Sequence, residues 1–340
     1  MIGCSNIFNA ELYKLVKLKT LFKILLAIVV IFIAFTLLYS LIYNVIGDMD
    51  ITIMPDVTEE NVELAEQSYE AYAEQLAGEN AMVKAHDSNL YSLKATAKLY
   101  RYLYDNNLDF NLVTLFGSFG KLSANGYITY ILGIMSTVIS IFAVVTIIKS
   151  FAGERTQGTL KMQLLRPVSK EAMITAKFLA VMVVSFALYL FSFILSGIVG
   201  VIAYDVDAKQ VVAVLNASHV VTMSPFGALI VYFVYYVSNT FAYIALGLFL
   251  SVILRKSEAL PIVVSIILLL VGASIEGLLG YIFIGYIGFN LNTSWLNALT
   301  ITGPGLNYMN LYSMLGISIV WVAGMLALSY FIFKKSDIHT

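Results

Sequence analysis

The sequence has few charged residues and almost no cysteine. Only 12% of its 340 residues are Asp, Glu, Lys or Arg, whereas 60% are hydrophobic. A soluble globular chain is nearer to one quarter charged and one half apolar. This composition therefore predicts a polytopic membrane protein. The single cysteine, Cys4, excludes an intrachain disulfide and any cysteine-based metal cluster, and we predict no metal site.

Patterns typical of membrane enzymes are also missing. The three histidines (His86, His219 and His339) lie outside the long apolar runs, which excludes intramembrane metalloproteases and rhomboid-like serine proteases. The nearest match to a phosphate-binding loop is 117–121. Leu115 stands there in place of the first glycine, and Leu122 follows the lysine where Ser or Thr is required. We predict no catalytic residue, no nucleotide-binding residue and no cofactor in this chain, which is therefore not an enzyme.

Six apolar stretches are candidates for membrane spans, each of which needs roughly 20 apolar residues. They cover 24–45, 126–148, 178–204, 229–254, 259–275 and 311–333, and the fifth is the shortest. The predicted fold is an all-α polytopic membrane protein with six transmembrane helices. Ionisable residues are almost absent from the spans, which disfavours a proton- or ion-driven carrier or channel. Glu276, at the outer end of the fifth span, is either an interfacial carboxylate or an ion-coupling residue.

The basic residues predict the orientation in the membrane, since Lys and Arg gather on the cytoplasmic side. Fourteen of the twenty fall in the N-terminal segment, the second-to-third and fourth-to-fifth connections, and the tail at 334–340. Both termini are therefore expected in the cytoplasm. The fourteen are Lys14, Lys17, Lys19, Lys23, Lys149, Arg155, Lys161, Arg166, Lys170, Lys177, Arg255, Lys256, Lys334 and Lys335.

Residues 46–125, between the first two spans, carry thirteen acidic residues and are expected outside the cell. Thr58–Ala77 lacks Pro and Gly and is rich in Glu and Ala, so it predicts a helix with Leu64, Tyr72 and Leu76 on one side. Leu90–Tyr104 has helical spacing of its apolar residues and predicts a second helix. We read 46–125 as an extracellular acidic helical subdomain, the alternative being a disordered acidic loop.

Two further segments border the membrane. Residues 1–23 combine an apolar stripe with lysines, which favours a cytoplasmic interfacial helix; the alternative is an extension of the first span. Residues 276–305 are apolar but interrupted by Gly and Asn, and a helix over 278–289 spans only about 18 Å. This segment either re-enters the outer leaflet or lies on its surface.

Polar residues inside the fourth span suggest a pathway through the membrane. Ser238, Asn239 and Thr240 form a polar run near its middle, and buried polar groups seek partners on neighbouring helices. With Tyr243 and Glu276 they could line a route for a substrate. Packing and interfacial anchoring are the alternative roles for the tyrosines.

The connection at 149–177 is a patterned polar island between two apolar runs. Thr156 or Thr159 could cap a short helix that runs to Leu165 and that Pro167 must end. Ser169 can cap the next helix, with Glu171 favourably placed in its first turn.

This island resembles the cytoplasmic loop of ABC-2 type exporter permeases. The matching residues are Glu154, Gly158, Thr159, Leu160, Leu164, Leu165, Pro167, Val168, Ser169, Lys170 and Lys177. The resemblance implies that this segment forms a coupling helix, which rests in a cleft of a separate ATP-binding cassette ATPase subunit. That partner would bind ATP and Mg, and a second permease copy or homologue would complete the path across a bacterial plasma membrane.

The long outer segment departs from sugar- and polymer-exporting relatives. It is similar to inserts in permeases of the sodium, bacitracin or lantibiotic-type peptide exporters. We therefore expect the export of an amphipathic peptide, an antibiotic or a lipid-like molecule, and a role in antimicrobial peptide resistance. The alternatives are sodium or other ion efflux within the same family, and a non-ABC membrane sensor whose acidic outer domain binds a ligand.

Overall fold

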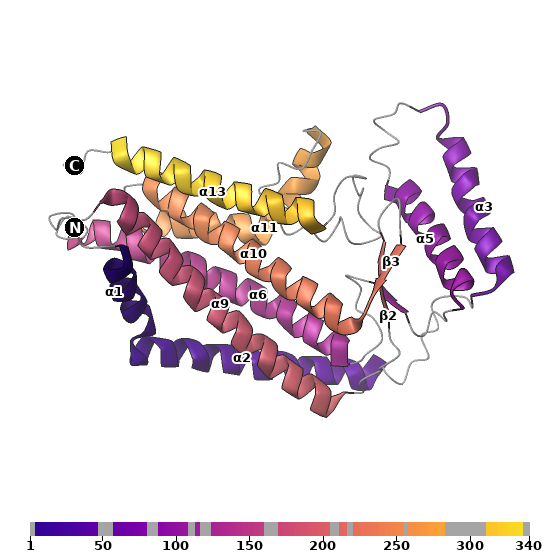
Figure 1. The fold of residues 1–340 in the computed structure, drawn as a ribbon, viewed down its shortest axis with the longest axis horizontal. Helices are drawn as coiled ribbons and strands as arrows, with labels where there is room; N and C mark the ends of the chain where they lie inside the picture. Colours follow the sequence, from indigo (N-terminus) through magenta and orange to yellow (C-terminus); the bar gives the residue numbers. More distant parts are fainter. Residues whose placement is uncertain are drawn as a thin grey trace.

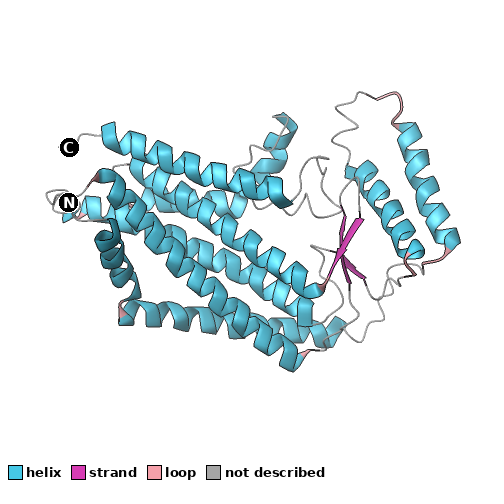
Figure 2. Cartoon of the chain, in the orientation of Figure 1, coloured by secondary structure: helices cyan, strands magenta, loops and turns pink. Residues whose placement is uncertain are grey.

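The computed structural model describes residues 4–46, 57–79, 88–107, 113–115, 124–159, 169–204, 211–215, 220–254, 257–282 and 311–335. Within them, a bundle of long helices carries a small sheet and a pair of helices at one end (Figures 1 and 2). We call this the sheet end, and we call the opposite end, where α1 lies, the α1 end. Residues 160–168, 283–305 and 336–340, for which we predict part of the coupling helix, part of the 276–305 segment and the tail, lie outside the described residues.

The bundle consists of long apolar helices: α2 (Leu18–Ile46), α6 (Ala124–Ile148), α9 (Lys170–Ala203), α10 (Pro225–Ile253), α11 (Ala259–Ile282) and α13 (Leu311–Lys335). In the described part of the chain, five helices are long and apolar enough to cross a membrane, and α11 contributes a shorter apolar stretch over Ala259–Leu270. The predicted class, an all-α polytopic membrane protein, is confirmed. The sixth span stays a prediction.

Two helices extend beyond the predicted spans toward the α1 end. Helix α6 continues through a π-helical turn, η2 (Lys149–Gly153), into the short α7 (Glu154–Thr156). Helix α9 begins at Lys170, so Lys177 is already inside it. Residues 149–156 and 170–177 of the predicted coupling loop are therefore helical, and Glu154 and Lys177 within them form an ion pair. The predicted cap is confirmed: Ser169 accepts a hydrogen bond from the Ala172 N–H at 3.1 Å.

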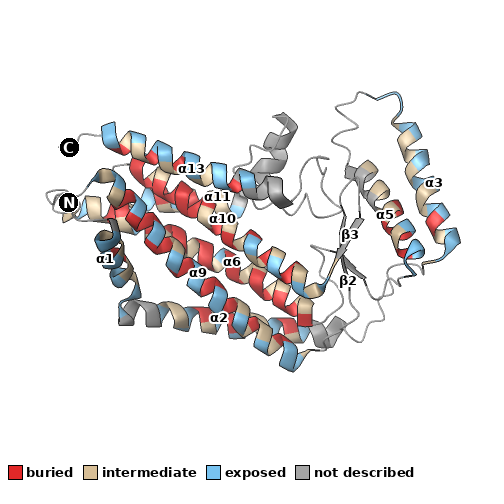
Figure 3. Cartoon of the chain, in the orientation of Figure 1, coloured by how far each residue is buried: buried red, intermediate tan, exposed pale blue. Residues whose placement is uncertain are grey.

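Helix α10 forms the centre of the bundle and contacts α6, α9, α11 and α13. In the apolar stretch of α10, 67% of the residues are buried inside the protein, against 17% in the apolar stretch of α2 (Figure 3). Close packing depends on small residues such as Gly247, where an added Cβ would lie 3.2 Å from the Ile147 side chain. Helix α2 buries one side, with Ile28, Phe32 and Tyr39 in the core, and exposes large apolar side chains such as Val30 and Leu37 on the other, as expected for a helix whose outer surroundings are lipid or another protein.

At the sheet end, α3 (Glu59–Gln75) and α5 (Ser88–Asp105) pack on each other, which confirms the two helices predicted within residues 46–125. Thr58 caps α3 by accepting the Asn61 N–H at 3.3 Å. Val62 of α3 and Leu99 and Leu103 of α5 are buried in this pair of helices. The predicted inward position of Leu64 is wrong, because it is 60% exposed and lies on the opposite side of the helix from Val62.

A three-stranded sheet, which the sequence analysis did not predict, joins two connections at the sheet end. Strand β1 (Val113–Leu115) pairs in parallel with β2 (Val211–Leu215), and β2 pairs antiparallel with β3 (Val220–Met223). The strands therefore tie the segment after α5 to the connection between α9 and α10. Strand β3 leads through Ser224, which caps α10 by accepting the Gly227 N–H at 3.2 Å.

The α3–α5 pair should weaken when the ion pair between Arg101 and Glu66 is removed. Arg101 binds Glu66 through two hydrogen bonds of 2.9 and 2.6 Å, and the bond from Arg101 lowers the pKa of Glu66 below 4.5. A lowered carboxyl pKa contributes stability above the ordinary value and loses it as the pH falls through the folded value. We expect Glu66→Gln to speed amide hydrogen exchange in α3, and wild-type exchange to approach that of the variant below pH 4.5.

The matched control is Glu63→Gln, which changes an exposed carboxylate on the same helix. Equal exchange in the two variants would contradict a stabilising role for the Glu66–Arg101 pair.

Candidate functional site at the α1 end of the bundle

The ends of several helices meet at the π turn η2 and the short helix α7. The Arg155 guanidinium donates to the Ser251 carbonyl at the end of α10, at 3.3 Å, and lies 5.2 Å from the centre of the Phe151 ring. Phe151 in turn packs edge-on against Phe333 near the end of α13, with ring centres 5.1 Å apart. Lys170, which opens α9, lies over the same Phe333 ring. A displacement of α7 would therefore disturb side-chain contacts of α9, α10 and α13.

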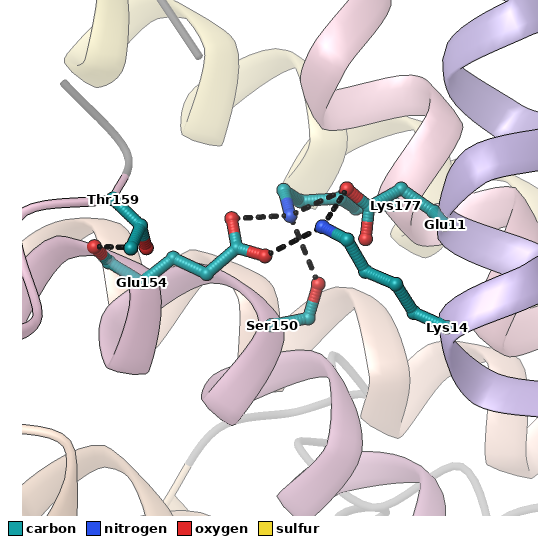
Figure 4. Close-up of polar contacts among 6 residues, drawn as sticks. All are labelled: Glu11, Lys14, Ser150, Glu154, Thr159 and Lys177. Carbon is teal, nitrogen blue, oxygen red and sulfur yellow. Dashed lines mark hydrogen bonds and ion pairs between the residues drawn. The ribbon is translucent and has the colours of Figure 1, made fainter. Parts of the chain in front are cut away.

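Four charged side chains form a closed ring beside η2 and α7 (Figure 4). The Lys177 ammonium lies 2.8 Å from Glu154 Oε2 and 3.1 Å from Glu11 Oε1. Lys14 lies 3.0 Å from the same Glu11 oxygen and 3.0 Å from Glu154 Oε1. Positive and negative groups therefore alternate around the ring, which joins α1 (Cys4–Val16), α7 and α9. We call these four residues the charge ring.

The charge ring is buried on one side and open on the other. The Lys177 side chain is fully buried, Glu11 and Glu154 are nearly so, and the Lys14 side chain is 49% exposed. A buried charge is costly unless it is paired and hydrogen-bonded. Lys177 meets this requirement with two carboxylates and the Ser150 hydroxyl at 3.2 Å. Burial by itself lowers the pKa of Lys14, but the hydrogen bonds and charges of Glu11 and Glu154 outweigh it and raise its pKa.

Local backbone geometry brings these groups together. Glu11 and Lys14 are three residues apart on α1 and so share one face of the helix. The π turn widens the helix just before Glu154, and such turns are frequent at functional sites. Gly153 leaves room for the turn to α11, since an added Cβ would lie 2.8 Å from Glu258 Oε2. Gly158 then has a φ of +75°, a conformation that side chains disfavour, and the chain turns away after α7.

A comparison with known protein families gives a match over nearly the whole chain. A sequence model described as ABC-2 family transporter protein matches residues 5–338, nearly the whole chain. The chain belongs to the ABC-2 transporter family. It is thus a membrane-spanning permease component of an ABC transporter. A search among curated proteins found no match.

The structure places part of the predicted ABC-2 coupling segment. Glu154 lies in the charge ring, Gly158 makes the turn, and Ser169 and Lys170 begin α9. The Thr159 hydroxyl donates to the Glu154 carbonyl at 3.1 Å. The remaining predicted residues lie outside the described residues: Leu160, Leu164, Leu165, Pro167 and Val168.

Thr156 is not the helix cap proposed from the sequence. It is the last residue of α7, and its hydroxyl donates to the Gly153 carbonyl at 2.9 Å instead of accepting a backbone N–H. The reason is that the helix of the second span does not stop at 148 but continues through η2 and α7 as far as Thr156. Glu11 and Lys14 were missed as site residues. Their signal in the sequence is a single acidic residue among the lysines of an amphipathic helix.

Four of the five predicted pathway residues, Ser238, Asn239, Thr240 and Tyr243, lie on the central helix α10 of the ABC-2 bundle. The Thr240 hydroxyl is 2.6 Å from Ser140 of α6 and 2.6 Å from Tyr189 of α9. These three hydroxyls, which we call the hydroxyl clasp, bind α6, α9 and α10 together. Asn239 and Tyr243 are buried beside it, Ser238 is half-buried, and the side chain of Glu276 lies outside the described residues. The clasp is a closed contact, and the substrate pathway stays a prediction.

Thr240→Val should loosen the bundle, because valine keeps the volume but leaves Ser140 and Tyr189 without their shared partner. Hydrogen bonds between membrane helices contribute modestly, so we expect a loss of about 1–2 kcal/mol in the free energy of unfolding. Denaturation in detergent micelles measures it. The control is Ser238→Ala, two positions away and less buried, and equal losses in both variants would contradict the role of the clasp.

Proposed function

We propose that this permease exports its substrate with energy from a separate ABC-type ATPase subunit, which docks on residues 158–169. The observation that carries the proposal is the charge ring. It fixes Glu154, the first residue of the segment that resembles a coupling helix, to both α1 and α9. A segment that transmits the motion of an ATPase to the membrane spans must be firmly attached to neighbouring helices at its first residue, as Glu154 is. A loop that only connects two spans needs no such attachment.

The α1 end is the cytoplasmic end in this proposal. Lys14, Lys170, Lys177 and Arg155 all lie there, and basic residues beside spans mark the cytoplasmic side of a membrane. The outer helices α3 and α5 lie at the opposite end of the bundle, as an extracellular subdomain requires (Figure 1). We place the protein in a bacterial plasma membrane, paired with a second permease around the exit route.

The substrate that we propose is a cationic amphipathic peptide or antibiotic. The side of α3 that faces away from α5 exposes five glutamates and the apolar Leu64. The glutamates are Glu59, Glu60, Glu63, Glu70 and Glu74. Such a surface attracts cations over a Debye length of about 8 Å at physiological salt. An exposed leucine among carboxylates would also suit a ligand that is both cationic and apolar.

Docking of the ATPase should depend on the apolar residues of 158–169. We expect the double variant Leu160→Asp, Leu164→Asp to insert normally into the membrane but to lose the coupling of ATP hydrolysis to transport, because two carboxylates would enter an apolar contact. Co-purification of the ATPase and transport into inside-out vesicles are the measurements. The control is Lys149→Met, an exposed change on η2. Normal coupling in the aspartate variant would exclude this docking site.

The outer subdomain should matter for the substrate and not for ATP hydrolysis. Deleting 58–104 with a short flexible linker leaves β1 in place, so the sheet at the end of the bundle can still form. We expect lower resistance to cationic peptides with unchanged basal ATPase activity. A milder variant, Glu63→Gln with Glu70→Gln and Glu74→Gln, removes charge but keeps the helices. Unchanged resistance in both, at equal expression, would move substrate recognition to the membrane spans.

A further inference from the structure

We infer that Glu11 and Lys14 of α1 are positioning residues for ATPase coupling, and that the charge ring transmits displacement of the coupling segment to α1. The inference rests on the proposed function. Its first support is the way in which Glu154 divides its two oxygens. Oε2 accepts from Lys177 of α9, and Oε1 accepts from Lys14 of α1. The first residue of the coupling segment is thus bound to two elements, α9 and α1.

The second support is that α1 completes the electrostatics of a buried lysine. Lys177 is fully buried and needs compensation for its charge. Oε1 of Glu11 lies 3.1 Å from the Lys177 ammonium, and the same oxygen also binds Lys14. If α1 moved away, Lys177 would keep only Glu154 and the Ser150 hydroxyl, Glu11 would lose Lys177, and Lys14, which moves with Glu11, would lose Glu154. Motion of α7 and motion of α1 are therefore linked through the ring, because separating them breaks two ion pairs at once.

The third support is what lies beyond α1. A single residue, Lys17, separates α1 from α2. Helix α2 is the least buried of the five apolar spans, so little packing resists its movement. Helix α10, by contrast, is fastened on several sides. The ring therefore connects the coupling segment to the span that can move at the lowest cost in packing. The direction of transmission is from α7 through Glu154, Lys14 and Glu11 to α1 and α2.

Alternation of charge provides a test that separates a ring from a simple pair. Exchanging only Glu154 and Lys177 (Glu154→Lys, Lys177→Glu) restores their own pair but sets position 177 against Glu11 and position 154 against Lys14 as like charges. Exchanging all four residues restores every contact. If α1 takes part in coupling, the double exchange loses the coupling of ATP hydrolysis and the quadruple exchange recovers it. If only the Glu154–Lys177 pair matters, the double exchange already works.

The measurement is ATP hydrolysis by the permease purified with an ABC-type ATPase from the same genome and reconstituted in vesicles. For the double exchange we expect permease-stimulated kcat to fall by at least about tenfold with an unchanged KM for ATP, since the nucleotide site is in the partner. The quadruple exchange should return it to within about twofold of the unaltered protein. Gel filtration in detergent shows whether each variant is folded.

Variants at Lys14 decide the matter even if the quadruple exchange does not fold. Lys14 is half exposed, so its loss disturbs packing little. We expect Lys14→Met to lower the stimulated kcat, Lys14→Arg to keep it, and the control Lys17→Met, an exposed change beside the same helix, to have no effect. The inference is overturned if the double exchange or Lys14→Met couples as well as the unaltered chain, or if a folded quadruple exchange recovers nothing. Absence of an ATPase from the unaltered complex would instead overturn the proposed function.

Discussion

A lysine with no exposed surface at the end of a membrane helix constrains everything around it. The charge of Lys177 cannot be left in an apolar environment, so carboxylates must be brought to it from elsewhere in the chain. One comes from α7 and one from α1, which fixes the position of both elements against α9. The continuation of α6 through a π turn and the placement of α1 across the end of the bundle both serve this requirement. The segment that resembles an ABC-2 coupling helix begins at Glu154, one of the two carboxylates that compensate the charge of Lys177.

Inside the bundle, a different solution satisfies polar groups. Ser140, Tyr189 and Thr240 bind each other across three helices without carrying charge. Hydroxyls suit this depth because an unpaired polar group in an apolar region is costly and an ion more so. The bundle thus uses neutral contacts in its middle and charged ones at its α1 end. The central helix α10 takes part in both, through Thr240 and through the Ser251 carbonyl that Arg155 binds.

The sheet end shows how an inserted segment can be attached to a bundle. Strand β1 follows the outer helix pair and β2 follows α9, so the parallel pairing brings together parts of the chain that are about a hundred residues apart. Short strands of β-branched residues such as Val211 and Val220 are a weak signal amid long apolar runs. Predicting them requires knowing that the two connections meet. The same limit applied to Leu64, whose direction depends on where α5 packs.

The sequence by itself determined the class of the protein, its apolar helices and its family, since these follow from local composition and from the residues of one motif. It also predicted the Ser169 cap, because capping depends on a residue and the three that follow it. Only the tertiary structure decided that Glu154 and Lys177 bind each other, that Glu11 and Lys14 join them, and that Thr156 lies within a helix. Charge pairing across 166 residues of chain is a matter of which helices meet, and no local pattern records it.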